Sequence, residues 1–170
     1  EVEQLMSLSL KLKFYVIFDA VYSKLYFDKE PHFPLNNLTE NCFYVNAFSK
    51  MLSITGWRVG YLLAHMNHMN HIKDIHDYTG LCVPSILQQA VANYLEQFGY
   101  GRDYIANLRK KLLNNYNFIS KHLTELGFTN YPAQGGYFVW TKLPGNFNSG
   151  LEFALELYSK QKVAVVPGIH

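Results

Sequence analysis

Apolar residues follow two different repeat patterns along the chain, and each change of pattern marks an expected element. An apolar stripe over residues 2–12 has the spacing of one helix face. Short β-rich apolar runs follow at 14–18, 42–48 and 59–64, and such runs are typical of strands. Because these runs are continuous rather than alternating, and a helix precedes the first, we expect strands buried on both faces of a largely parallel sheet.

The second half of the chain is first helical and then mixed. Residues 66–126 keep a helical period, with breaks near 80–84 and 98–101. Beyond Gly127 the period changes again, which predicts a smaller α+β unit. Its expected parts are a strand at 137–141, a turn at 143–145, a helix at 150–160 and a strand at 163–166. We place the boundary inside the long helix, so that the two expected domains are 1–108 and 109–170.

Composition and charge exclude several classes of protein. The chain has 170 residues, 49% of them apolar, and a formal net charge of +2, which is typical of a globular domain. Its longest apolar runs are far shorter than a membrane span, and its cationic residues are scattered. We therefore expect neither nucleic acid nor a membrane as a partner. Cys42 and Cys82 are too far apart to form a zinc motif or a disulfide framework, so a soluble, cytoplasmic protein is expected.

Both ends of the sequence suggest that segments are missing. The chain begins inside the amphipathic pattern without a capping residue or an initiator Met, and it stops just after Pro167 and Gly168. A sheet with so few strands would also leave edges uncovered. His65, His68 and His71 are spaced three apart on an expected helix, where they drift around the axis, so we interpret them as exposed residues rather than metal ligands.

Four polar residues follow or adjoin the expected strands. Asp19 and Tyr22 come after the first strand, Lys50 comes after the second, and Arg58 directly precedes the third. Taken singly, an aspartate after a strand is usually a turn residue, and a lone lysine or arginine is usually solvated. Open α/β sheets, however, bind ligands at the carboxyl ends of their strands, so the four side chains could line one crevice.

The order and spacing of these residues carry a family resemblance. The segments D-A-V-Y at 19–22, F-S-K at 48–50 and T-G-W-R-V-G-Y at 55–61 resemble the signature of class I and II aminotransferases, the fold-type-I pyridoxal-phosphate enzymes. P-A-Q-G-G-Y-F-V-W at 132–140 and V-A-V-V-P-G at 163–168 are similar to the family's small-domain segments. The resemblance covers the whole chain but only the middle and later part of a complete family member.

The resemblance implies a fold, a cofactor and a reaction. The fold would be α/β: part of a large domain that binds pyridoxal 5'-phosphate (PLP), with a mainly parallel sheet and helices, followed by a small α+β domain. The reaction would transfer an amino group between an amino acid and a 2-oxo acid in a homodimer. The upstream phosphate loop and the downstream arginine that grips the substrate carboxylate would lie outside these residues.

Each of the four residues receives a role by this resemblance. Lys50 would form the Schiff base with the cofactor aldehyde and then move a proton. Asp19 would pair with the pyridine nitrogen, Tyr22 would hydrogen-bond the phenolic oxygen, and Arg58 would hold the phosphate. Ala47 departs from the family, which often has Ser or Gly there, and it cannot donate a hydroxyl hydrogen bond.

Two alternatives to the aminotransferase remain open from the sequence. The same fold supports other PLP reactions, such as those of a C–S β-lyase, a decarboxylase or a synthase. The chain as given could also be an inactive fragment or an assembly module, because cofactor-binding groups would lie on both missing sides.

Overall fold

The computed structural model describes residues 1–82, 84–145 and 147–168, and they form two compact units. The first unit comprises Glu1–Leu112 and Gln134–Gly136, and the second comprises Leu113–Ala133 and Tyr137–His170. Parts of the expected break at 80–84 and the last two residues of the chain lie outside the described residues.

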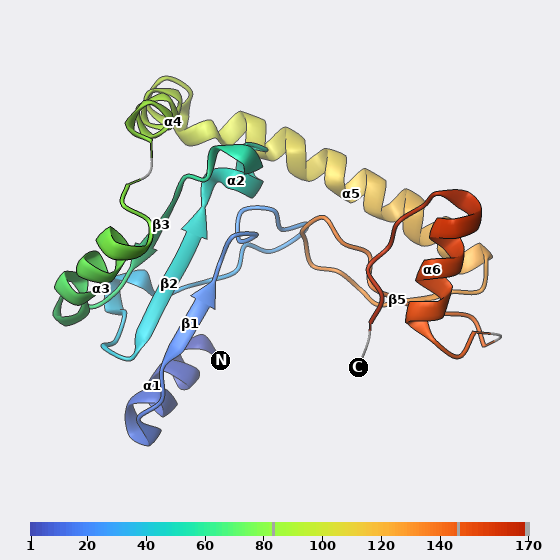
Figure 1. Cartoon of the computed structure of the whole chain (residues 1–170), viewed down its shortest axis with the longest axis horizontal. Coiled ribbons are helices and arrows are strands. Elements are labelled where there is room, and N and C mark those ends of the chain that lie inside the picture. The colour runs from blue at the N-terminus through green and yellow to red at the C-terminus, as the bar shows by residue number, and fades with distance from the viewer. Residues whose placement is uncertain (83, 146, 169–170) are drawn as a thin grey trace. The chain divides into compact units, whose positions relative to one another are not determined.

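A three-stranded sheet forms the centre of the first unit (Figure 1). Helix α1 (Val2–Leu12) precedes β1 (Val16–Asp19), which is followed by β2 (Cys42–Ala47) and β3 (Gly60–Leu63). The sheet order is β1-β2-β3. The expected helix and three strands are therefore confirmed, with the strands shorter by one to two residues at most ends.

The strand directions differ from the expectation at β3. β1 and β2 pair in parallel, whereas β2 and β3 pair antiparallel. The connection from β2 to β3 contains only the one-turn helix α2 (Phe48–Met51) and the 3₁₀ turn η2 (Thr55–Trp57). A parallel return needs a crossover that spans the sheet, and this connection turns back at the same edge instead.

The expectation that the strands are buried on both faces is wrong for the outer strands β1 and β3. Side chains of β2 alternate between buried and half-buried, but β1 alternates between half-buried and exposed. Ile17 of β1 is 68% exposed. Ile17 pairs with half-buried Phe43 of β2, whereas its neighbours Val16 and Phe18 pair with buried Cys42 and Tyr44, so one face of the sheet is less covered than the other.

The remaining helices of this region confirm the two expected breaks. The helices are α3 (Met66–Thr79), α4 (Ser85–Gln97) and α5 (Arg102–Glu125), with the 3₁₀ turn η3 (Gly99–Gly101) before α5. Gly99 and Gly101 have positive φ angles of 57° and 71°, a backbone conformation that favours glycine. Tyr100 between them also has a positive φ, of 61°, so glycine favours the break at two of its three left-handed residues.

Helix α1 is fastened to β2 through a buried polar contact. Ser9 and Cys42 are both fully buried. The Ser9 Oγ lies 3.6 Å from the Cys42 Sγ, and the Asn41 Nδ2 donates to the Ser9 carbonyl at 3.0 Å. Buried polar groups with partners cost little, so this contact fixes the helix without destabilising the core.

The loop after β1 is held by a segment that comes from far along the sequence. Leu25 is fully buried, and its carbonyl accepts from the Gly136 amide at 2.8 Å. The Phe27 amide donates to the Gln134 carbonyl at 2.8 Å, and Tyr26 and Gly135 form an isolated antiparallel bridge. Three consecutive residues thus behave as a short strand against the loop.

The second unit has less regular structure than the sequence predicts. The expected helix is confirmed as α6 (Gly150–Gln161). Two short strands, β4 (Thr129–Asn130) and β5 (Thr141–Lys142), pair with each other, and the sequence did not predict β4. Of the expected strand at 137–141, only Thr141 is in β5, and 163–166 is not a strand. A β-rich run becomes a strand only when another strand pairs with it, which sequence propensity does not report.

Among the described residues, no helix combines the length and the apolar character that crossing a membrane requires.

We predict that Gly135→Ala destabilises the first unit. A Cβ at this position would lie 2.3 Å from the Leu25 carbonyl oxygen and 2.8 Å from the Tyr26 Cα, so backbone would have to move. Overpacking of this kind costs roughly 1–3 kcal/mol of unfolding free energy. Urea unfolding measures the loss, and Gly56→Ala is the matched control because its Cβ would meet nothing within 4 Å. Equal stability of the two variants would contradict the prediction.

We also predict that Tyr61 makes stability depend on alkaline pH. Burial first, and then the neighbouring Tyr44, raise the pKa of Tyr61 above its ordinary value of 10.0. The folded chain therefore holds this proton more tightly than the unfolded chain. The resulting stabilisation is fully present below pH 10 and is lost as pH rises through the folded pKa. Unfolding midpoints across this window should fall more steeply for the wild type than for Tyr61→Phe, and parallel curves would refute the assignment.

Candidate active site

The candidate site lies where β1 and β2 end. Because β1 and β2 run parallel (Figure 1), their carboxyl ends meet at one edge. Asp19 is in register with Val45. β3 runs the other way, with Gly60 paired to Ala47, so its first residue lies at this same edge. The backbone thus brings the segments that carry all four expected site residues to one end of the sheet.

Lys50 and Tyr22 are in contact. Lys50 lies in α2, one turn beyond β2, and its Nζ is 5.6 Å from the centroid of the Tyr22 ring. Both side chains are half-buried. The amine therefore faces an aromatic π surface, and two residues 28 positions apart in sequence share one place.

Asp19 is the last residue of β1 and is exposed. Its Oδ1 accepts from the Val21 amide at 3.4 Å. This long contact is the local turn interaction that an aspartate after a strand commonly makes. The carboxylate lies at the expected edge of the sheet and accepts a hydrogen bond from its own loop.

Arg58 directly follows η2 in a left-handed backbone conformation with a φ of 55°. Its side chain is exposed, and Nη1 donates to the Thr55 carbonyl at 3.1 Å. A non-glycine residue with positive φ is uncommon and is enriched at functional sites. The hydrogen bond from Arg58 to the Thr55 carbonyl stabilises the turn that leads into β3.

Asn46 places a buried carboxamide beside the site, and the sequence patterns did not predict it. Asn46 is 3% exposed and interrupts the apolar run of β2. Its Nδ2 donates to the Tyr44 hydroxyl at 2.9 Å and to the Ser23 hydroxyl at 3.3 Å. Its Oδ1 accepts from the Ala47 amide at 2.7 Å. A polar residue within an otherwise apolar strand was the available signal, because a buried amide needs partners.

These groups define what the edge could do chemically. An amine can attack a carbonyl carbon, a phenol can donate a hydrogen bond or accept a proton, and a guanidinium can bind an anion. Within the described residues, His, Cys, Asp and Glu form no group of three or more that could hold a metal ion. The expectation that His65, His68 and His71 are exposed is wrong for the first two, which are half-buried, and is confirmed for His71. His65 caps α3, and the His68 ring contacts the Glu40 carbonyl oxygen at 2.9 Å.

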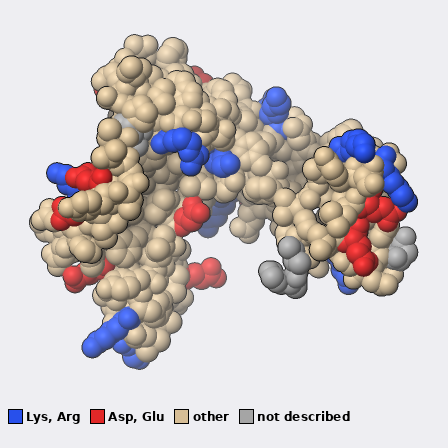
Figure 2. All heavy atoms as spheres, viewed as in Figure 1, with Lys and Arg blue, Asp and Glu red and all other residues tan. Residues whose placement is uncertain are grey.

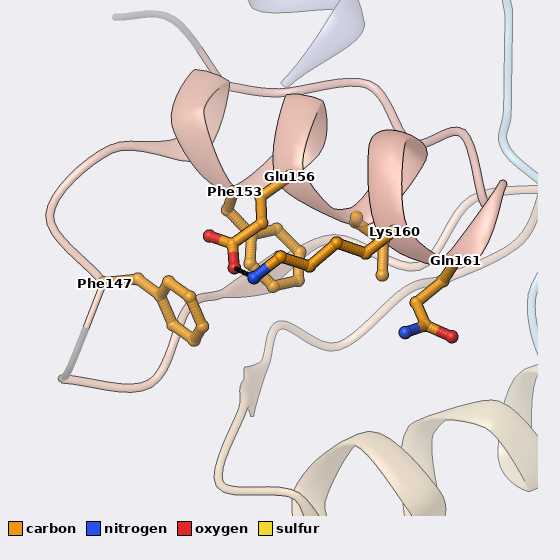
Figure 3. Close-up of a pocket in the computed structure, with 6 residues that line it drawn as sticks. Phe147, Phe153, Glu156, Lys160 and Gln161 are labelled. Atoms are coloured by element: carbon orange, nitrogen blue, oxygen red, sulfur yellow. Dashed lines mark hydrogen bonds and ion pairs between the residues drawn. The ribbon is translucent and has the colours of Figure 1, made fainter.

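A hollow of about 200 Å³ lies elsewhere, along α6 in the second unit (Figure 3). Phe147 and Phe153 line it together with Glu156 and Lys160. Lys160 donates to the Glu156 carboxylate at 2.6 Å, and both side chains are more than half exposed. Lys160 is thus engaged in a solvent-exposed ion pair, and Lys50 is not among the residues that line the hollow.

Comparison with curated proteins finds aminotransferases. The chain is 30% identical over 168 residues to aspartate aminotransferase from Thermotoga maritima, covering 98% of this chain and 42% of the relative. It is 30% identical over 154 residues to LL-diaminopimelate aminotransferase from Natranaerobius thermophilus, covering 89% and 39%. The chain spans less than half the length of these relatives.

Solved structures show the same relationship. The Thermotoga maritima aspartate aminotransferase matches with a TM-score of 0.84 and 28% identity, over 98% of this chain and 42% of that chain. N-succinyldiaminopimelate aminotransferase from Mycobacterium tuberculosis matches with a TM-score of 0.88 and 26% identity, over 98% and 44%. The expected fold, part of a fold-type-I aminotransferase, is therefore confirmed.

The family model for aminotransferase class I and II matches residues 1–170, so the chain belongs to the class I and II aminotransferase family.

Proposed function

We propose that the protein carrying this chain is a PLP-dependent aminotransferase that transfers an amino group between an amino acid and a 2-oxo acid, with Lys50 as the attachment residue. The contact between Lys50 and Tyr22, 5.6 Å from amine to ring centroid, carries the proposal. It places a nucleophilic amine beside a phenol at the carboxyl edge of a parallel strand pair, where open α/β sheets bind cofactors.

The residues present fit the groups of this cofactor. An aldehyde needs an amine, a ring phenolate needs a hydrogen-bond donor, a pyridinium needs a carboxylate and a phosphate needs a cation. Lys50, Tyr22, Asp19 and Arg58 supply these four in turn, and all come from segments that end or begin at one edge of the sheet. When bound, the cofactor supplies an electron sink for the substrate α-carbon.

The chain's own residues then divide the work. Lys50 would supply the amine that holds the cofactor aldehyde and, when freed, the base that moves a proton at the substrate α-carbon. Tyr22 would donate a hydrogen bond to the phenolic oxygen and so tune the proton affinity of the Lys50 nitrogen. Asp19 would pair with the ring nitrogen and keep it protonated, and Arg58 would bind the phosphate through a planar pair of N–H donors.

One departure weakens the phosphate site. Ala47 pairs with Gly60 across the antiparallel strands, three residues before Lys50, where the family often has Ser or Gly. A methyl group donates no hydrogen bond, so Arg58 and groups elsewhere in the full protein must supply more of the phosphate binding.

We further propose the setting in which the enzyme works. Residues 1–108 contribute to the PLP-binding large domain and 109–170 to the small domain of a cytoplasmic homodimer. The partners are small-molecule substrates, an amino acid and a 2-oxo acid, rather than nucleic acid or membrane. On the face in Figure 2, cationic side chains form small separate groups with uncharged surface between them, which supports the absence of a nucleic-acid stripe.

We predict that Lys50→Ala removes covalent attachment of PLP. In the full protein, borohydride reduction should link the cofactor covalently to Lys50. A proteolytic digest should then yield a labelled peptide that contains this residue. Lys50→Ala should abolish that adduct and lower amino transfer by roughly a thousandfold or more, because the attacking and proton-moving group is lost. Lys73→Ala is the matched control, since Lys73 is exposed on α3. An adduct that persists in Lys50→Ala would refute the assignment of this lysine.

A panel of amino acids and 2-oxo acids tests the reaction itself. An aminotransferase converts the amino donor to its 2-oxo acid while the acceptor gains the amino group. Release of ammonia, pyruvate or carbon dioxide without amino transfer would identify another PLP reaction on this fold and overturn the proposal.

A further inference from the structure

We infer that Asn46 is a positioning residue that sets the place of Tyr22 relative to Lys50; this rests on the proposed function. The inference starts from its location. Asn46 is the last buried side chain of β2, four residues before Lys50. Asn46 is 3% exposed, so leaving the hydrogen-bonding groups of its carboxamide without partners would be costly.

Asn46 links two segments that carry different parts of the candidate site. Its Nδ2 donates to the hydroxyl of Ser23, which is adjacent to Tyr22, at 3.3 Å. Its Oδ1 accepts from the Ala47 amide at 2.7 Å, where β2 leads into α2. One carboxamide therefore connects the Tyr22 loop to the backbone that supports Lys50.

The loop is tied to β2 on both sides of Tyr22. Before it, the Ala20 amide donates to the Val45 carbonyl at 2.8 Å. After it, the Ser23 hydroxyl accepts from Asn46. The turn is closed by the Leu25 amide, which donates to the Tyr22 carbonyl at 2.8 Å. Without the Ser23 contact, the loop keeps its tie before Tyr22 but loses the side-chain tie that follows it.

The partners of Asn46 offer a matched pair of substitutions. Ser23→Ala and Tyr44→Phe each remove one hydroxyl that accepts from Nδ2. Only the first cuts the tie to the loop, because Tyr44 lies on β2 with Asn46. Ser23→Thr keeps a hydroxyl and serves as the conservative rescue. These variants avoid the larger disruption of Asn46→Ala, which would leave three partners of a buried group unmatched.

The first readout needs no cofactor. The rate of hydrogen exchange at the Leu25 amide, measured by NMR in the protein without PLP, reports how often the turn that holds Tyr22 opens. We expect about tenfold faster exchange in Ser23→Ala, the effect of losing one partly buried hydrogen bond. We expect no change in Tyr44→Phe and near wild-type exchange in Ser23→Thr. Equal exchange in Ser23→Ala and the wild type would overturn the inference.

The second readout tests whether the positioning acts through Tyr22. The absorption of PLP bound to the full protein is titrated with pH in Tyr22→Phe, Ser23→Ala and the double variant. We expect Ser23→Ala to shift the titration in the direction of Tyr22→Phe and to add nothing in the double variant, since both remove one coupled interaction. An additive shift would mean that Ser23 acts on the titration independently of Tyr22, and it would overturn the inference.

The two failures are distinguishable. If no variant, including the wild type, binds PLP through Lys50, the proposed function fails, whereas the exchange experiment still decides whether Asn46 holds the loop. If PLP binds and Tyr22→Phe shifts the titration while Ser23→Ala does not, the proposed function stands and the positioning role is refuted.

Discussion

The parallel pairing of β1 with β2 is the constraint on which the candidate site depends. Parallel strands end at the same edge, so the register of Asp19 with Val45 decides where the residues after each strand lie. Tyr22 follows β1 and Lys50 follows β2, and their contact is a consequence of that register. Sliding one strand by a residue would turn its side chains to the other face and would separate the pair.

The third strand depends on a close backbone approach. A Cβ on Gly60 would lie 2.8 Å from the Asn46 carbonyl oxygen, so glycine is needed for β3 to pair with the end of β2. The connection from β2 to β3 is short and turns back at the same edge, and Arg58 adopts its left-handed conformation there. The short connection that makes β3 antiparallel therefore also brings the segment of Arg58 to the edge where β2 leads into Lys50.

Local patterns predicted the elements of this chain better than their pairing. Continuous apolar runs located β1, β2 and β3, and Gly99 and Gly101 marked the break before α5, because these signals act within a few residues. The direction of β3 and the failure of 163–166 to form a strand depend on which partner is available, which no local pattern contains. The anchoring of the loop by Gln134–Gly136 is likewise a contact between residues over 100 positions apart.

The candidate site shows the same division in its chemistry. Residue types and spacing pointed to Lys50, Asp19, Tyr22 and Arg58, and the structure places Lys50 against Tyr22. Asn46 carries no such signature, because an amide has no reactive group and its value comes only from its partners. Asn46 occupies a buried position on β2 where an apolar side chain would pack without needing hydrogen bonds. The carboxamide gives up apolar packing at this position. In return it fixes the loop of Tyr22 to the strand that leads to Lys50.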